Sequence, residues 1–505
     1  MKFAQSAQIT RSGGILLHPT SFPGPYGVGD VGEYAQRFID FLADSGCKLW
    51  QVLPLGPTGY GDSPYQCFSA FAGNPYLVSP DALLGMGLLT RDDLSHMPAW
   101  PAHQVDFGGL YRWKPALLEK AYRCFEALPS GSLRADFNAF RSSNASWLED
   151  FALFMALKES HGGAPWTEWP APLRTRQPGA LADARSLLAA RISSVAFSQF
   201  LFFRQWNALR DYAHSKNVKI IGDVPIFVAM DSADVWANPD LFYLDEAGKP
   251  TVVAGVPPDY FSLTGQLWGN PLYRWEKHKD SGYAWWIERV SASLKTVDIV
   301  RIDHFRGFAG YWEVPGGAPT AEKGRWAPGP GPALFHAIQK ALASSSGAGL
   351  PIIAEDLGVI TPDVVKLRDS FHLPGMKILQ FAFSGPDNGF LPHHYTPNCV
   401  VYTGTHDNDT TVGWYASAPV AERDFARRYL RVDGSDFAWD LIRAAWSSVA
   451  VFALAPLQDF LSLETEARMN FPGKPQGNWT WRMSENDLGP GLAERISELN
   501  RLYAR

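Results

Sequence analysis

Short runs of apolar residues, each ending in a polar residue, glycine or proline, recur along most of the chain. Eight such runs occupy residues 14–18, 49–54, 218–223, 298–303, 351–356, 376–381, 399–403 and 448–453. Near-continuous apolar runs are typical of parallel strands covered on both faces, whereas half-exposed strands alternate apolar and polar residues. The pattern therefore predicts eight buried strands.

Amphipathic stretches lie between many of these runs and predict helices. Examples are residues 33–43, after the first run, and residues 333–343, before the fifth run. Eight strands with intervening helices predict an α/β fold of the (β/α)8 or TIM barrel type, with functional side chains at the carboxyl ends of the strands. Because a buried helix can also contain a short apolar run, this prediction depends on the motifs described below as well.

The uneven spacing of the runs predicts insertions into a single catalytic barrel that spans residues 1–505. The interval 67–217, between the second and third runs, is far longer than a usual strand-to-helix connection. Within it, residues 133–160 and 181–216 have apolar positions at three- and four-residue spacing. This spacing indicates helices, so we expect a mostly helical insertion.

Two further insertions are richer in glycine, proline and aromatic residues. Residues 227–283 predict an irregular segment that forms part of the substrate groove, and residues 314–332 predict a loop over the site. The chain after the eighth run is much shorter than the roughly 100 residues of a β-sandwich domain. We therefore expect no C-terminal β-sandwich.

Charge and composition narrow the classes of function. Hydrophobic residues make up 46% of the chain, charged residues 19%, and the net charge is -6. This acidic balance argues against a nucleic-acid partner, which requires a basic surface. No apolar stretch approaches the roughly 20 residues of a membrane helix. The N-terminus lacks the apolar segment of a secretory signal, so we expect a cytoplasmic protein without a membrane partner.

The cysteines and aromatic residues change this picture only slightly. Cys47, Cys67, Cys124 and Cys399 lie far apart and form no CxxC pair, and no Gly-rich phosphate loop is present. We therefore expect reduced thiols, no metal and no cofactor.

The chain contains 19 Trp, 18 Tyr and 31 Phe. Flat aromatic faces suit the apolar face of a sugar ring, although large α/β enzymes also fill their cores with aromatic residues.

The fourth run ends in the most informative local sequence, Val-Arg-Ile-Asp-His-Phe-Arg-Gly at residues 300–307. Side chains two positions apart on a strand point the same way, so Arg301 and Asp303 should face the barrel mouth together. A nearby arginine lowers the pKa of a carboxyl group, which would keep Asp303 ionised and nucleophilic. A structural ion pair at the end of a strand is the alternative.

The fifth and seventh runs also end in acidic residues. Glu355 follows the fifth run and, close to Asp303, would have the raised pKa that a general acid needs. Asp356, beside it, is interpreted as a helix cap or structural partner. After the seventh run, Asp407 could stabilise positive charge on a sugar ring while His406 binds a hydroxyl group. An Asx-rich turn is the alternative for this segment.

The segments around Asp303, Glu355 and Asp407 resemble the catalytic triad of the α-amylase superfamily. More specifically, the chain resembles the 4-α-glucanotransferases of the amylomaltase (disproportionating enzyme) family, glycoside hydrolase family 77. The likeness runs from about residue 13 to the C-terminus. It also rests on residues 56–66, 71–76, 255–261, 264–271 and 375–381.

This resemblance implies a retaining transfer of α-1,4-glucan segments to the 4-hydroxyl of glucose or another maltooligosaccharide. Asp303 is expected as nucleophile, Glu355 as acid/base and Asp407 as stabiliser, with maltooligosaccharides and α-1,4-glucans as partners. Residues 222–227 lack the Asn-His pair usual in amylases, so Asp223 is expected as a hydrogen-bonding residue of the site rather than a fourth catalytic acid. The expected substrate-binding residues are Tyr60, Asp223, Tyr260, Trp268, Asn270, Arg301, His304 and His406.

Three other functions stay open at this point. An α-1,4-glucan hydrolase of the same superfamily would have the same three acids. A glucan-binding protein without activity would not need them. An unrelated barrel enzyme that uses a phosphate or a metal finds little support, because His393 and His394 are the only adjacent histidines.

Overall fold

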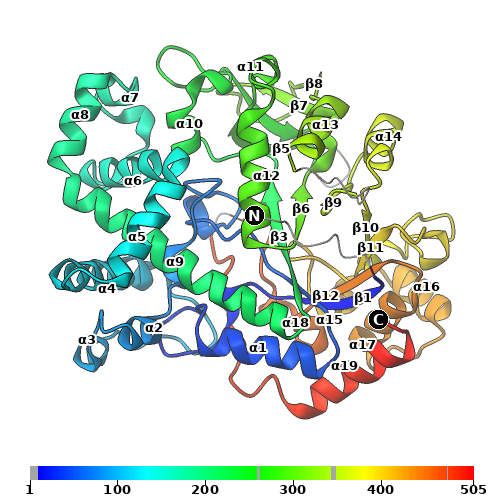
Figure 1. The fold of residues 1–505 in the computed structure, drawn as a ribbon. Helices are drawn as coiled ribbons and strands as arrows, with labels where there is room; N and C mark the ends of the chain where they lie inside the picture. Colours follow the sequence, from blue (N-terminus) through cyan, green and yellow to red (C-terminus); the bar gives the residue numbers. More distant parts are fainter. Residues whose placement is uncertain (1–9, 259–261, 343–348, 475) are drawn as a thin grey trace.

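A barrel of eight parallel strands lies at the centre of the computed structural model, which describes residues 10–258, 262–342, 349–474 and 476–505 (Figure 1). Each of the eight apolar runs coincides with or overlaps one strand. The eighth run was placed too early, since Ser448 caps the end of a helix and the strand begins at Phe452. The strands are β1 (Ser12–Leu16), β2 (Leu49–Gln51), β3 (Lys219–Pro225), β6 (Ile299–Asp303), β9 (Ile352–Ala354), β10 (Gly375–Ile378), β11 (Cys399–Tyr402) and β12 (Phe452–Pro456).

The hydrogen bonds between strands show how the barrel closes. The order is β10-β11-β12-β1-β2-β3-β6-β9. From β9, the Ala354 N–H donates to the carbonyl of Pro374, just before β10, at 2.9 Å. Every strand contributes at least one buried apolar side chain to the interior, as in a packed TIM barrel. These side chains are Leu16, Leu49, Ile221, Ile299, Ile353, Met376, Ile378, Val400, Tyr402, Phe452 and Leu454. The predicted (β/α)8 fold is confirmed.

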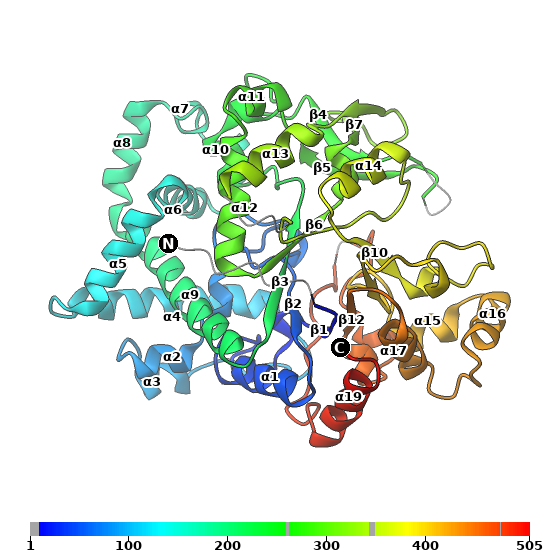
Figure 2. The same ribbon diagram turned by 45° about the vertical axis from the view of Figure 1, so that its right-hand side comes forward.

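Helices cover the outside of the barrel (Figures 1 and 2). Their buried faces are apolar, as in the amphipathic α1, where Phe38, Ile39 and Leu42 are buried. They are α1 (Glu33–Asp44), α12 (Ala284–Thr296), α13 (Pro332–Ala341), α14 (Pro362–Ser370), α15 (Thr411–Ser417), α16 (Val420–Leu430), α17 (Phe437–Ser447), α18 (Leu457–Phe460) and α19 (Pro490–Leu502).

A group of helices lies between β2 and β3, on the left of Figure 1. Each of the two helical segments predicted here consists of two helices. Among the described residues no single helix is long and apolar enough to span a membrane, and one pair, α8 with α9, meets that test only together, with a bend of 80°. The group comprises α2 (Pro80–Gly85), α3 (Arg91–Ser95), α4 (Phe107–Ala127), α5 (Ser132–Ser143), α6 (Ala145–Ser160), α7 (Ala171–Arg174), α8 (Pro178–Leu187) and α9 (Ala189–Ser215).

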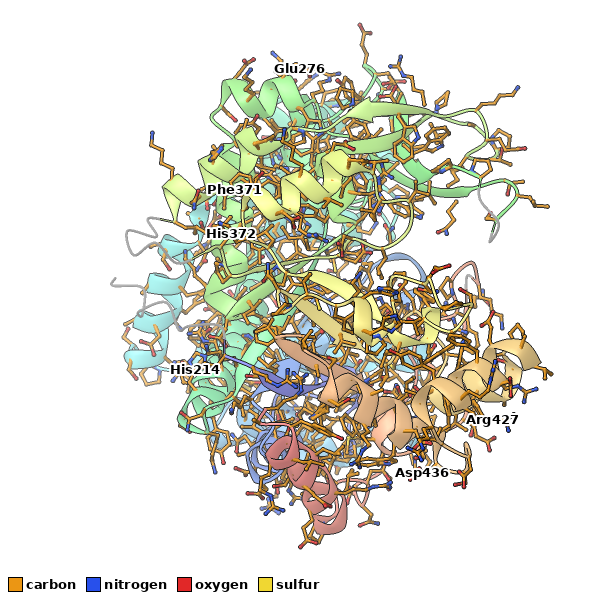
Figure 3. The ribbon with its side chains drawn as sticks, turned by 90° about the vertical axis from the view of Figure 1, so that its right-hand side faces the viewer. His214, Glu276, Phe371, His372, Arg427 and Asp436 are labelled. Atoms are coloured by element: carbon orange, nitrogen blue, oxygen red, sulfur yellow. The ribbon has the colours of Figure 1, made fainter. Side chains whose placement is uncertain are left out.

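A second, antiparallel sheet was not predicted from the sequence. It consists of β4 (Val252–Val256), β5 (Gln266–Pro271), β7 (Gly310–Pro315) and β8 (Arg325–Pro328), in the order β5-β4-β7-β8. Two short helices, α10 (Ala233–Ala237) and α11 (Trp275–Asp280), belong to the same part of the chain. In Figure 3 the green segments near Glu276 lie at the top and the orange segments near Asp436 at the bottom. Segments expected to be irregular or looped thus form a sheet on the far side of the molecule from α17.

Candidate functional site

The carboxyl ends of β3, β6, β9 and β11 bring four acidic residues to one end of the barrel. Asp223 lies on β3, Asp303 is the last residue of β6, and Glu355 and Asp407 follow β9 and β11. Asp303 and Asp407 line a cavity of about 390 Å³. Among the described residues, no group of three or more His, Cys, Asp or Glu side chains could hold a metal ion.

Arg301 connects two of these acids. Its Nη1 lies 2.5 Å from Oδ2 of Asp223, and its Nη2 lies 3.0 Å from Oδ1 of Asp303. Its Nε lies 3.2 Å from the sulfur of Met376, on strand β10. The Arg301 side chain is only 4% exposed, so its charge is compensated by these two carboxylates rather than by water. The structure thus brings together three residues that the sequence placed on two strands.

The pKa of Asp303 does not follow the simple prediction made from Arg301. Burial raises this pKa to about 6, and the charge of Arg301 opposes the rise without cancelling it. The prediction of a lowered pKa was therefore wrong. Arg301 shares its charge with Asp223, and the negative charges of Asp223 and Asp407 raise the Asp303 pKa further.

The surroundings of Glu355 favour its protonated form more strongly than those of Asp303 do. Its two carboxyl oxygens accept the N–H groups of His304, at 2.6 Å, and Leu357, at 2.8 Å. Burial and the charge of Asp303 raise the pKa of Glu355 to about 8, although Arg301 and the two N–H groups oppose the rise. His304 has a positive φ of 55°, which a non-glycine residue adopts only at some cost. This conformation accompanies the contact between its N–H and Glu355.

Asp356, the neighbour of Glu355, points to different partners. Its Oδ2 accepts from Arg368 at 2.5 Å, and its Oδ1 accepts the Met376 N–H at 2.7 Å. Both bonds tie the end of β9 to α14 and β10. Asp356 therefore has the structural role that the sequence suggested.

Asp407 is held ionised by its surroundings. Asn470 donates to its Oδ1 at 2.6 Å, and Nε2 of His406 lies 3.3 Å from its Oδ2. Burial opposes ionisation, but these two partners outweigh it and lower the pKa of Asp407. The same pairing raises the pKa of His406, against the effect of its burial. Arg468 also donates to the backbone carbonyl of Asp407 at 2.5 Å, which fixes the turn.

Tyr65 is a residue of the site that the sequence analysis missed. Its hydroxyl donates to Oδ2 of Asp223 at 2.6 Å, and its ring stacks on His406 with centroids 4.9 Å apart. Tyr65 belongs to the same motif, residues 56–66, as the predicted Tyr60. The side chain of Tyr60 lies outside the described residues. The motif was a usable signal, but the sequence analysis singled out only Tyr60 from it, and that prediction stays untested.

Two further residues of the cavity were missed because they lie far along the chain. Asn470 and Trp479 both line it, and the Trp479 ring lies 5.8 Å from His406. Their segment contains no acidic cluster or strand pattern that would have indicated the site. Only the contact of Asn470 with Asp407 reveals the connection.

The predicted substrate-binding residues near β5 divide into three cases. Trp268 lines the cavity, and its ring meets His304 edge-on at 4.7 Å. Asn270 also lines it, but its side-chain amide donates to the Val228 carbonyl at 2.9 Å. Tyr260 lies outside the described residues.

Comparisons with known sequences and structures identify the family of the chain. A model of the 4-alpha-glucanotransferase family matches residues 17–487. A 4-alpha-glucanotransferase of Thermus thermophilus is 54% identical over 97% of this chain and 98% of its own length. One of Synechocystis sp. is 50% identical over 98% of both chains. The amylomaltase from Streptococcus agalactiae, solved in complex with acarbose, superposes with a TM-score of 0.94 at 40% identity, over 98% of this chain and 99% of its own. The chain therefore belongs to the 4-alpha-glucanotransferase family.

Proposed function

We propose that this 4-α-glucanotransferase transfers α-1,4-glucan segments by double displacement, with Asp303 as nucleophile, Glu355 as acid/base and Asp407 as stabiliser. The acceptor is the 4-hydroxyl of glucose or of another maltooligosaccharide. The observation that carries the proposal is the pair of unequal carboxyl groups. The pKa of Asp303 is raised to about 6 and that of Glu355 to about 8. Between these values Asp303 is ionised while Glu355 keeps its proton.

In the first step, a carboxylate oxygen of Asp303 attacks the anomeric carbon, and the bond from that carbon to the departing glucan breaks. The proton of Glu355 passes to the glycosidic oxygen, so the departing chain leaves as a neutral alcohol. The fixed negative charge of Asp407, next to the cavity, stabilises the positive charge that develops on the ring. The pKa of Asp407 is lowered, so this charge persists at acidic pH.

In the second step, Glu355 acts as the base. It removes the proton of the incoming 4-hydroxyl, whose oxygen attacks the anomeric carbon and displaces Asp303. Loss of the negative charge on Asp303 during the intermediate favours a lower pKa for Glu355 than in the free enzyme, because that charge is a cause of the raised value. Two inversions give net retention of configuration.

Substrate recognition is proposed for the residues around these acids. Trp268 and His304, which line the cavity, offer an aromatic face and an imidazole. His406, Arg301 and Asp223 offer polar groups beside the nucleophile, and Asn270 contributes the wall of the cavity. Substrate-binding roles for Tyr60 and Tyr260 stay predictions from the sequence.

The test is incubation with maltotriose, followed by separation of the products by size. Transfer gives glucose together with a ladder of longer maltooligosaccharides, without a net gain of reducing ends. A net gain of reducing ends without longer products would instead identify a hydrolase. An Asp303→Ala variant with unchanged turnover would contradict the proposed nucleophile.

Two broader predictions complete this proposal. We infer that residues 67–217, 227–283 and 314–332 are insertions into one catalytic barrel.

The four cysteines are all free, which supports a reducing compartment such as the cytoplasm. Fractionation of cells that produce the protein would test the location.

A further inference from the structure

Trp326, on β8 of the antiparallel sheet, is an unusually exposed aromatic residue. Its side chain is 44% exposed, whereas most tryptophans of the described chain are buried. The Arg306 guanidinium lies over its ring, with Cζ 3.9 Å from the centroid. Trp312, directly opposite on β7, meets the ring edge-on at 5.3 Å. Arg306 thus covers one face of the ring, and 44% of the residue stays exposed beside the contacts with Arg306 and Trp312.

Arg306 connects this aromatic residue to the catalytic end of the barrel. It lies in the short helix η6 (Phe305–Phe308), directly after His304, whose N–H binds Glu355. Although it is charged, Arg306 is only 6% exposed. Its Nε donates to the Gly310 carbonyl at 3.3 Å, and its Nη1 donates to the carbonyl of Val359. These bonds fix the guanidinium as a rigid support for the Trp326 ring.

The second of these contacts indicates on which side of the site Trp326 lies. Val359 belongs to the loop that follows Glu355, and it is 57% exposed. In the proposed mechanism, which this inference rests on, Glu355 protonates the departing glucan and deprotonates the incoming one. A general acid of this kind lies on the side of the leaving group. In Figures 1 and 2 the sheet that contains β7 lies beside α13 and α14, the helices before and after β9.

We propose that Trp326, supported by Arg306, is a glucan-binding surface on the acceptor side of the site. Its ligand is a glucosyl ring of an α-1,4-glucan chain, remote from the cleaved bond, whose C–H face lies on the exposed surface of the indole. A flat ring already fixed by a guanidinium and a second indole binds at little further entropic cost. The surface favours long acceptors, because glucose in the cleavage site does not extend to it.

The first experiment compares acceptors in the full enzyme. Maltoheptaose or glucose, labelled so that only its own extension is counted, is supplied with an unlabelled donor. In Trp326→Leu we expect the ratio of kcat/KM for maltoheptaose to that for glucose to fall about three- to tenfold, the loss of one aromatic contact. Trp326→Phe, which keeps a flat ring, should stay within about twofold of the native ratio. Leu187→Ala, at an 84% exposed position of α8, is the control.

The second experiment measures binding without turnover. In an Asp303→Ala background, calorimetry should show the same three- to tenfold weakening of maltoheptaose binding by Trp326→Leu, about that of one aromatic contact. If Trp326→Leu changes neither the ratio of kcat/KM nor the affinity for maltoheptaose, the proposal is overturned. Equal losses in Trp326→Leu and Trp326→Phe would also overturn it. If the native enzyme extends no acceptor, the proposed function fails, and calorimetry still decides whether Trp326 binds glucan.

Discussion

At the scale of single residues, one buried arginine, Arg301, forms ion pairs with two acids of the site. A third acid, Glu355, has no such ion pair among the described residues, and its pKa is raised. Arg301 contacts Asp223 and Asp303. The carboxyl oxygens of Glu355 instead accept the backbone N–H groups of His304 and Leu357. A full charge from one arginine cannot ionise three buried carboxyl groups, so their pKa values separate. This separation is what acid/base catalysis at neutral pH requires.

The pH dependence of kcat/KM follows from this separation. In the proposed mechanism Asp303 must be ionised, so we expect activity to fall as the pH drops through about 6. Glu355 must be protonated there, so we expect activity to fall as the pH rises through about 8. We expect Glu355→Gln to be about 10²- to 10⁴-fold slower and to lose the alkaline limb. A maltosyl fluoride donor, whose leaving group needs no proton, should restore much of the first step. A retained alkaline limb in this variant would exclude Glu355 as the acid.

Replacing Asp223 should move the acidic limb in a defined direction. The negative charge of Asp223 raises the pKa of Asp303, so Asp223→Asn should lower it and shift the acidic limb to lower pH. The variant should also be less active, since Tyr65 and Arg301 both lose a charged partner. Asp298→Asn, just before β6 and at the end opposite to Asp303, is the matched control. A limb that stays in place or moves to higher pH would contradict this coupling.

At the scale of elements, the barrel was predictable because each of its strands makes a continuous apolar run. Strands β4, β5, β7 and β8 were not, since β5 and β8 are largely exposed. The pairing of β4 with β7, which joins the two halves of this sheet, also connects segments far apart in the chain. The acids of the site were predictable because they end strands. Tyr65 and Asn470 were not, because only folding brings them to Asp223 and Asp407.

One helix has a direct effect on the site through a buried arginine. Arg289 of α12 donates to the Pro225 carbonyl at 2.6 Å and to the Ile226 carbonyl at 3.0 Å, at the end of β3. Its guanidinium also lies over Trp285 and Trp286. The end of β3 that follows Asp223 thus depends on a neighbouring helix rather than on strand pairing alone.

We expect Arg289→Met to destabilise the protein by about 2–4 kcal/mol, because two buried carbonyl groups lose a charged donor. Urea unfolding followed by circular dichroism would measure the change. Arg204→Met, which removes a surface pair with Asp136, should cost less than about 1 kcal/mol. Equal effects of the two substitutions would show that the buried bonds contribute no more than a surface pair.

At the scale of the whole molecule, segments from the two ends of the sequence meet where β1 pairs with β12. This pairing joins Ser12 to Phe452 and continues to Leu16 and Pro456. Contacts between residues so distant in sequence have a high entropic cost, because a very long loop must close before they form. The closure of the barrel, and with it the geometry of every strand end, depends on what stabilises this seam.

Arg505 is the residue that we expect to matter most at this seam. Its buried guanidinium donates to the carbonyl groups of Trp446 on α17, of Ser448 at the C-cap of that helix, and of Ser12 on β1. Burial and the nearby Arg11 lower its pKa to about 9. Burying this charge therefore costs free energy, and the hydrogen bonds to the carbonyl groups offset that cost.

We expect Arg505→Ala to lower the free energy of unfolding by about 2–4 kcal/mol, since several buried carbonyl groups would lose a charged donor. The slope of the urea transition should stay the same if the native barrel remains closed, and it should fall if the seam opens, because less surface would then be exposed on unfolding. Arg501→Ala, at an exposed position of α19, is the matched control and should change stability by less than about 0.5 kcal/mol. If Arg505→Ala also leaves stability unchanged, the strand pairing alone closes the barrel.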